Sequence, residues 1–271
     1  MLSERKGKGV VKVHAGVPSQ VCPDHEFLRS YSIFLRLKSL YTGGCLHNYR
    51  KRYDELASKL NISSSTLRKA VAFLKNKKFA ISKGQHLWFI SADKVSKHFE
   101  GHQSKGYKIF PDENTESKIQ TLSIYENLTK QENAIKAQFI KVELEKVYGN
   151  VKNIQYKAIR KLHRALSALS MKEIKKRIYK QPTQYKGISA HATLSRQGLA
   201  KLLGYENKST GSRIVKRLVG LGFLEDVKVL HKVVISGITE YSFRKLHFEG
   251  AFYWRAGKVF KAMPHSIYVK L

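Results

Sequence analysis

The chain has few acidic residues, only two cysteines and no long apolar run. Its 271 residues include 20 Asp and Glu against 51 Lys and Arg, a formal net charge of +31. Because no run of about 18 apolar residues occurs, we expect no membrane-spanning helix. The N-terminal stretch MLSERKGKGVVKVHAG has no long apolar core before small residues, so we expect no secretory signal. Two cysteines provide no disulfide framework and fit a reducing cytosol.

The chain also lacks the residue patterns that usually carry catalysis. It has no Walker-type phosphate loop, no pair of histidines separated by one apolar residue, and too few acidic residues for a two-metal nuclease. His47-Asn48-Tyr49-Arg50 matches the HxxR of tyrosine recombinases, and Tyr268 lies near the C-terminus. That family places another arginine well before HxxR, inside a helical domain, which disfavours this interpretation. We therefore predict no enzymatic activity and no cofactor.

Positive charge is what the chain has in excess. A net charge of +31 is far beyond what solubility requires, and nucleic acid is the polyanion that usually neutralises such charge. Hydrophobic residues make up 42% of the sequence, which excludes a disordered basic tail. A chain of this length can bury two hydrophobic cores. These bounds predict a folded nucleic-acid-binding protein.

The stretch from Tyr53 to Ser91 has the pattern of two short helices followed by a hairpin. Asp54 and Glu55 favour a helix N-terminus, and Asn61-Ile62-Ser63 predicts a tight turn. Ser63 or Ser64 can cap a second helix. Apolar residues recur in that helix at core-facing spacing, namely Leu67, Ala70, Val71 and Leu74. Phe79–Ile81 and Leu87–Ile90 then predict two strands around Lys83-Gly84.

The same pattern occurs again between Thr193 and Glu225. Ser195 can cap a helix, Gly204 ends it, and a second helix begins near Ser209. The apolar residues expected to pack in the first helix are Leu199, Ala200, Leu202 and Leu203. Those that match Ala70, Val71, Leu74 and Phe79 of the first copy are Ile214, Val215, Leu218 and Phe223. Two copies of one pattern are much harder to obtain by chance than one.

Helix, turn, helix and hairpin together resemble the winged-helix family of DNA-binding domains. The resemblance implies that the second helix of each motif lies in the major groove and that the hairpin tip contacts phosphate. The residues that would face DNA are Ser64, Ser65, Arg68, Lys69, Lys83, Lys208, Ser209, Ser212, Arg213 and Lys216. The alternative is a small helical hairpin whose charged face is merely solvated.

The remaining segments complete a predicted α+β, mainly helical fold with two winged helix-turn-helix domains joined by long helices. The predicted divisions are a basic extended arm (1–25), a first winged-helix domain (26–100), a linker and helical segment (101–150), and a second winged-helix domain with a leading helix and β-rich C-terminal strands (151–271). Within them we expect a helix from Glu26 to Tyr41, an irregular connection from Ala92 to Thr115, and one long or two shorter amphipathic helices from Glu116 to Tyr148.

A further helical stretch is expected from Val151 to Lys180, before a short strand at Ile188–Leu194. Its predicted apolar face consists of Ile154, Ala158, Leu162, Ala165 and Leu169, and its basic face of Lys157, Arg160, Lys161 and Arg164. The basic face indicates a nucleic-acid contact or a solvated surface. The β-rich C-terminal segment is expected to form a hairpin wing and an added sheet.

Two thiols and two imidazoles form the one candidate metal site. Cys22, His25, Cys45 and His47 could close a tetrahedral zinc site, although the spacing matches no known finger. Ordinary buried cysteines beside surface histidines are the alternative, so no metal is predicted.

The tandem motifs resemble replication initiators of plasmids and phages. This resemblance implies a sequence-specific double-stranded DNA-binding protein in the cytoplasm of a bacterium or a phage-infected host cell. A transcriptional regulator of a mobile element is the first alternative, and a protein that coats nucleic acid or binds RNA is the second. In the initiator family one winged helix can dimerise the protein, so a homodimer stays open, and we expect no membrane partner.

Overall fold

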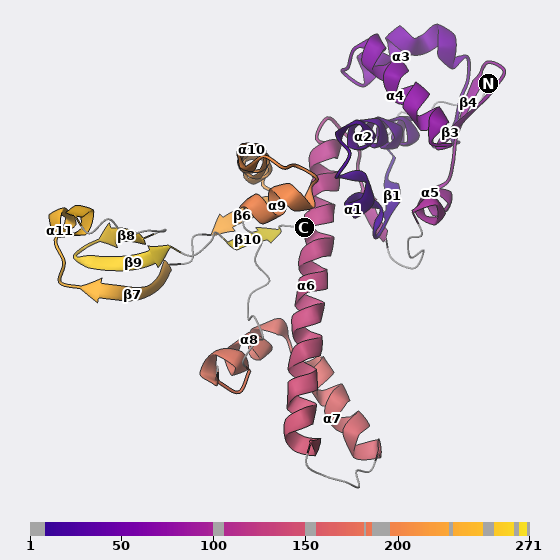
Figure 1. Cartoon of the computed structure of the whole chain (residues 1–271). Helices are drawn as coiled ribbons and strands as arrows, with labels where there is room; N and C mark the ends of the chain where they lie inside the picture. The colour runs from indigo at the N-terminus through magenta and orange to yellow at the C-terminus, as the bar shows by residue number, and fades with distance from the viewer. Residues whose placement is uncertain are drawn as a thin grey trace. The chain divides into compact units, whose positions relative to one another are not determined.

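The computed structural model describes residues 9–99, 106–149, 156–181, 183–185, 196–227, 230–245, 252–262 and 266–269. In this part the fold is α+β and mainly helical, with small antiparallel sheets, as predicted (Figure 1). None of the described helices is long and apolar enough to cross a membrane. The chain forms two compact units, each considered separately below. The first contains Met1–Glu126, Ser195–Val227 and Ile267–Leu271, and the second Asn127–Leu194 and Lys228–Ser266.

The first unit begins with folded elements where an extended arm was expected. Strand β1 (Val11–His14) pairs antiparallel with β5 (Gly106–Ile109), and helix α1 (Val17–Val21) follows. Val13, Val17 and Val21 are completely buried. The prediction of an extended arm is therefore wrong for these residues, because their valines form part of a core. Residues 1–8 of the predicted arm lie outside the described residues.

Helix α2 (His25–Leu40) is the central element of the first core and confirms the helix predicted from Glu26 to Tyr41. Asp24 caps it, since one carboxylate oxygen accepts a hydrogen bond of 3.0 Å from the Phe27 N–H. The buried face of α2 carries aromatic rings that pack against Phe79, with ring centroids 5.6–6.3 Å from it: Phe27, Tyr31 and Phe34. This cluster joins α2 to the hairpin strands.

The first helix-turn-helix forms as predicted. A short 3-10 helix, η1 (Tyr49–Arg52), leads into α3 (Tyr53–Lys59) and then α4 (Ser64–Asn76). The turn between them contains Asn61 with a positive φ of 51°, and the Ser63 hydroxyl caps α4 at the Thr66 N–H. The predicted core residues Leu67, Ala70, Val71 and Leu74 are all buried, which confirms the helical register.

A three-stranded antiparallel sheet follows the first motif, in the order β2-β4-β3. Strand β2 (Cys45–Leu46) pairs with β4 (His86–Phe89), and β4 pairs with β3 (Ala80–Lys83) across a turn at Gly84. The turn favours glycine, because its φ is +58°. The predicted hairpin is thus present, with its strands shifted by one or two residues.

The expected irregular connection from Ala92 to Thr115 contains two regular elements. Helix α5 (Ala92–His98) is capped by Ser91, and β5 pairs with β1. Helix α6 (Thr115–Tyr148) then forms one continuous helix, the first of the two arrangements expected for 116–148. In the first unit it buries Ile119, Leu122 and Ile124.

The second helix-turn-helix consists of α9 (Arg196–Leu202) and α10 (Lys208–Gly220). Gly204 has a φ of +81° in the turn, and Asn207 caps α10, which begins at Lys208, close to the predicted start near Ser209. Predicted core residues that are buried are Leu199, Ala200, Leu203, Ile214, Val215 and Leu218, whereas Leu202 and Phe223 are only half-buried. The predicted Ser195 cap and the strand at 188–194 lie outside the described residues.

The predicted wing after the second motif is wrong. Strand β6 (Leu224–Val227) pairs with β10 (Ser266–Val269), and β7 (Leu230–Ser236) belongs to another sheet. The two strands that were expected to form a hairpin therefore have different partners, because the C-terminal strand returns to pair with β6.

The second unit has a helical core and a separate sheet. Helices α7 (Tyr156–Ala168) and α8 (Met171–Lys180) replace the single stretch expected, since a Ser170–Glu173 capping box starts a new helix. The core residues are Ile135, Phe139, Ile140, Leu166, Ile174, Ile178 and Tyr185. The predicted apolar face of this segment is confirmed in part: Leu162 and Leu169 pack against this core, whereas Ala158 and Ala165 are exposed and the unpredicted Leu166 is buried. Ile154 of that face lies outside the described residues.

The sheet of the second unit confirms the predicted C-terminal strands but adds a helix. Strands β8 (Phe252–Arg255) and β9 (Lys258–Ala262) form an antiparallel hairpin, and β7 pairs with the other edge of β9. Helix α11 (Glu240–Lys245), which was not predicted, lies between β7 and β8 in the chain. The Trp254 indole donates a hydrogen bond of 2.8 Å to the Ile238 carbonyl.

Candidate nucleic-acid interface

The outer face of α4 presents the predicted contact residues to solvent. Ser65, Arg68 and Lys69 are exposed and Ser64 is half-buried, on the opposite side from the core residue Leu67. This outcome follows from the helical period, because residues 67, 70, 71 and 74 turn inward together.

Neighbouring side chains of α3 restrain this face. The Arg68 guanidinium carbon lies 5.1 Å from the centre of the Tyr53 ring, a cation–π contact. The Ser64 hydroxyl donates a hydrogen bond to the carboxylate of Asp54. Both contacts limit the rotamers of Arg68 and Ser64. Binding of a ligand would therefore cost less side-chain conformational entropy.

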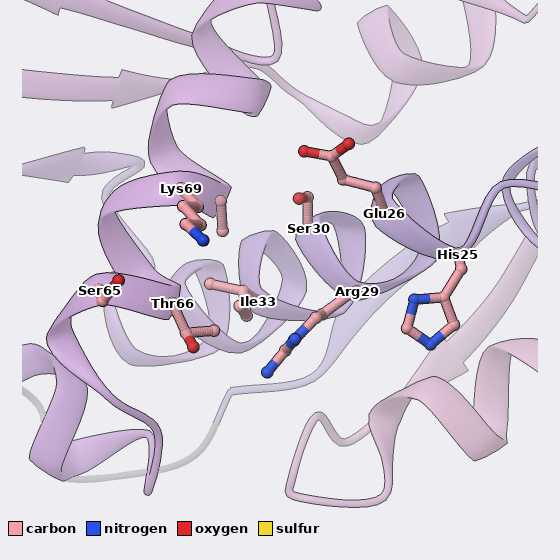
Figure 2. Close-up of a pocket in the computed structure, with 9 residues that line it drawn as sticks. His25, Glu26, Arg29, Ser30, Ile33, Ser65, Thr66 and Lys69 are labelled. Carbon is pink, nitrogen blue, oxygen red and sulfur yellow. The ribbon is translucent and has the colours of Figure 1, made fainter.

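A hollow lies beside this face, between α4 and α2 (Figure 2). Ser65, Thr66, Lys69 and Ala70 line it from α4, and the residues from α2 are His25, Glu26, Arg29, Ser30 and Ile33. Arg29 is exposed and adds a second cation beside Lys69, whereas Glu26 partly offsets their charge. Sequence reasoning missed Arg29, because it belongs to a helix that precedes the motif.

Further cations lie at the tip of the hairpin and beside strand β3. Lys83, the predicted hairpin residue, is exposed next to the Gly84 turn. Three exposed cations line a hollow with Ile81 and Ser82 of β3: Arg50 of η1, and Lys75 and Lys78 at the end of α4 and just after it. None of the three was predicted as a contact, since only the tertiary fold brings Arg50 near Lys75 and Lys78.

The pKa of the Tyr49 phenol is lowered by the cations near it. Burial raises its pKa, but hydrogen bonds with Arg50 and Ser82 and the nearby charge of Lys75 outweigh burial, so the net shift is downward. The Arg50 Nε–H donates to the Tyr49 oxygen at 3.4 Å, and Ser82 lies 3.0 Å from the same oxygen. Positive charge that stabilises a phenolate would stabilise a phosphate as well.

The outer face of α10 is divided between solvent and α6. Ser209 and Lys216 are exposed, Ser212 is half-buried, and Lys208 is the first residue of the helix. Arg213 is exposed but lines a hollow with Glu116 and Gln120 of α6. Arg217 lines the same hollow and donates a hydrogen bond of 2.6 Å to the Gln120 side chain.

His25 is shared by the hollows beside the two second helices. It lines the one beside α4 and also the one beside α10. The two predicted contact faces therefore lie near one exposed residue at the start of α2, within the first unit.

The second unit has a basic face of its own. Lys157, Arg160, Lys161 and Arg164 are all exposed on α7 and line one shallow hollow. Their grouping confirms the predicted basic face as a surface, while its partner stays a prediction.

Comparisons with family models, characterised proteins and solved structures find no match to this chain. The assignment of a role therefore depends on the described surfaces themselves.

The structure brings together only two of the four candidate zinc ligands, Cys45 and His47. Cys22 is buried, and burial raises the pKa of its thiol to about 12, partly opposed by a hydrogen bond with Ser123. His25 is exposed at the start of α2. The one group of potential metal ligands among the described residues joins Cys45 and His47 to His86 instead. His86 was missed because only the strand register places it opposite His47.

Proposed function

We propose that this protein binds double-stranded DNA sequence-specifically through its two helix-turn-helix motifs. The observation that carries the proposal is the recurrence of the motif: both second helices, α4 and α10, bury one apolar side and expose Ser, Arg and Lys on the other. A single exposed basic helix is common. Here each of two copies of the motif has one, and the chain carries a net charge of +31, which favours nucleic acid as the ligand of both.

The first motif supports the winged-helix mode of binding. Its second helix is followed by a hairpin whose exposed Lys83 and neighbouring cations would contact the phosphate backbone. Among the described strands no such hairpin follows the second motif, because β6 and β7 belong to different sheets, so α10 would bind with its helix alone. Phosphate contacts would supply affinity, and groove contacts by Arg68 and Arg213 would supply specificity.

Within this class we propose a replication initiator of a plasmid, phage or other mobile element. Tandem motifs in one chain suit the repeated sites of an origin, because each motif can read a half-site. A transcriptional regulator would use the same contacts, and the location of the bound sites distinguishes the two.

Selection of bound sequences from random duplex DNA at physiological salt tests the proposal. We expect one enriched motif, and its occurrence at an origin or at a promoter then selects initiator or regulator. Enrichment of no motif, with retention of all DNA or of RNA instead, would leave a coating or RNA-binding protein.

Substitution of the two arginines tests which helices read the sequence. Arg68→Ala and Arg213→Ala should each weaken binding to the selected site by about 1–3 kcal/mol, and binding to unrelated DNA by less. Lys97→Ala, which removes an exposed charge on α5, is the matched control. If both arginine variants keep the affinity and preference of the control, α4 and α10 are not recognition helices.

A further inference from the structure

A thiol and two imidazoles converge on the outer face of the β2-β4 strand pair. The potential ligand atoms of Cys45, His47 and His86 all lie within 4.8 Å of one another. The Nδ1 atoms of His47 and His86 are 3.0 Å apart, and the two rings meet edge to face with centroids 4.8 Å apart.

The strand register explains why these three side chains meet. Cys45 pairs with Trp88 and Leu46 with Leu87, so the next residues, His47 and His86, are opposite one another. Leu46 and Leu87 point into the core. Side chains alternate along a strand, so Cys45, His47 and His86 share the outward face.

The backbone around this group is fixed on both sides. The Phe89 N–H donates to the Gly44 carbonyl at 2.8 Å, and the Tyr49 N–H donates to the Gln85 carbonyl at 3.2 Å. The backbones that carry the three side chains are therefore held next to one another. They also remain accessible, since His47 is exposed and Cys45 and His86 are half-buried.

The separation is close to what a metal ion requires. Tetrahedral zinc with about 2.3 Å to sulfur and about 2.0–2.1 Å to nitrogen places its ligand atoms roughly 3.3–3.6 Å apart. Side-chain rotations that close the group by about 1 Å would bring all three onto one ion. One thiolate with two imidazoles is a ligand set suited to zinc, whereas Mg²⁺ and Ca²⁺ prefer oxygen ligands.

We propose that Cys45, His47 and His86 bind a zinc ion with three protein ligands and a fourth position open to water. Binding displaces the thiol proton, so one proton is released as the thiolate coordinates. The ion would connect β2 to the hairpin that follows the first helix-turn-helix. This inference does not depend on the proposed DNA binding.

Metal uptake by the purified full-length protein under reducing conditions tests the site. Dialysis against zinc followed by elemental analysis should give one ion per chain and a higher thermal unfolding midpoint. With Co²⁺ as the probe, a thiolate-to-cobalt charge-transfer band should appear. Cys45→Ser should abolish that band, and His86→Gln should weaken binding at least about tenfold.

Cys22→Ala and His25→Gln are the matched controls, because they remove the other thiol and an exposed histidine outside the group. Circular dichroism verifies that each variant folds, and His25→Gln suffices if the buried Cys22 cannot be replaced. Absence of stoichiometric metal, or a cobalt spectrum that Cys45→Ser leaves unchanged, would overturn the site. Loss of the band in a folded Cys22→Ala variant would assign the thiolate to the other cysteine.

Discussion

At the scale of single residues, Gly204 in the second turn has both a positive φ and a close backbone neighbour. Its φ is +81°, which L side chains rarely adopt, and a Cβ there would lie 2.4 Å from both Cα and the carbonyl oxygen of Pro23. Gly222 follows α10 with a similar φ of +75°, but a Cβ there would meet nothing within 4 Å. Substitutions at Gly204 and Gly222 therefore distinguish the cost of a positive φ from the cost of a steric clash with Pro23.

We expect Gly222→Ala to cost about 1–2 kcal/mol of stability, the penalty of a left-handed conformation. Gly204→Ala should cost more, because the backbone at Pro23 must also move. Urea denaturation of both full-length variants measures the difference. Equal costs would show that the turn does not approach Pro23 closely.

The buried leucines of α4 and α10 test the helical registers on which the contact faces depend. Leu74 and Leu218 are completely buried, so Leu74→Ala and Leu218→Ala should each lower the free energy of unfolding by about 2–5 kcal/mol. Lys75→Ala and Lys216→Ala, one or two residues away and exposed, should change it by less than about 0.5 kcal/mol. A small effect of both leucine substitutions would contradict the registers.

At the scale of elements, the β8-β9 hairpin contains a residue that suits its turn poorly. Arg255 pairs with Lys258, which leaves a loop of Ala256 and Gly257 with φ values of 48° and 73°. Positive φ at both positions is the type I′ pattern, for which Asn-Gly is preferred because Asn tolerates this region better than Ala.

Ala256→Asn should therefore stabilise the hairpin, by about 0.5–1 kcal/mol if part of the left-handed penalty is relieved. Gly257→Ala should have the opposite effect, since it introduces a Cβ where φ is positive. Thermal unfolding monitored by circular dichroism measures both. Destabilisation by Ala256→Asn would argue against a type I′ turn at this position.

At the scale of the whole molecule, the net charge of +31 predicts how DNA binding depends on salt. Each neutralised phosphate adds about −0.9 to the slope of log affinity against log salt, so we expect a slope steeper than about −5. If both motifs read one duplex, the footprint should show two half-sites about 10 bp apart. Arg68→Ala should weaken protection of one half-site and Arg213→Ala that of the other.

Binding titrations between low and physiological salt, with footprints of the same samples, check these expectations. A shallow slope without a protected site would contradict specific DNA binding and favour a protein or RNA partner. Two identical half-sites that lose protection together in the Arg68→Ala variant would instead indicate that two chains bind through their first motif.

The sequence by itself determined the elements whose information is local. The period of apolar residues predicted α2, α4, α6 and α10, and the turn residues Asn61, Gly84 and Gly204 marked the breaks between elements. Helical registers follow from such patterns because burial repeats every three to four residues. The exposed faces of α4 and α7 were accessible to the same reasoning.

Only the tertiary structure decided which distant segments meet. Strand β1 is part of a core because β5, far along the chain, pairs with it. Strand β6 pairs with the C-terminal strand β10 and not with β7, the strand that follows it. The same dependence explains Arg29 beside Lys69, the cations around Ile81, and His86 beside Cys45 and His47. Pairing between strands depends on which edges become adjacent in space, and no local periodicity encodes that choice.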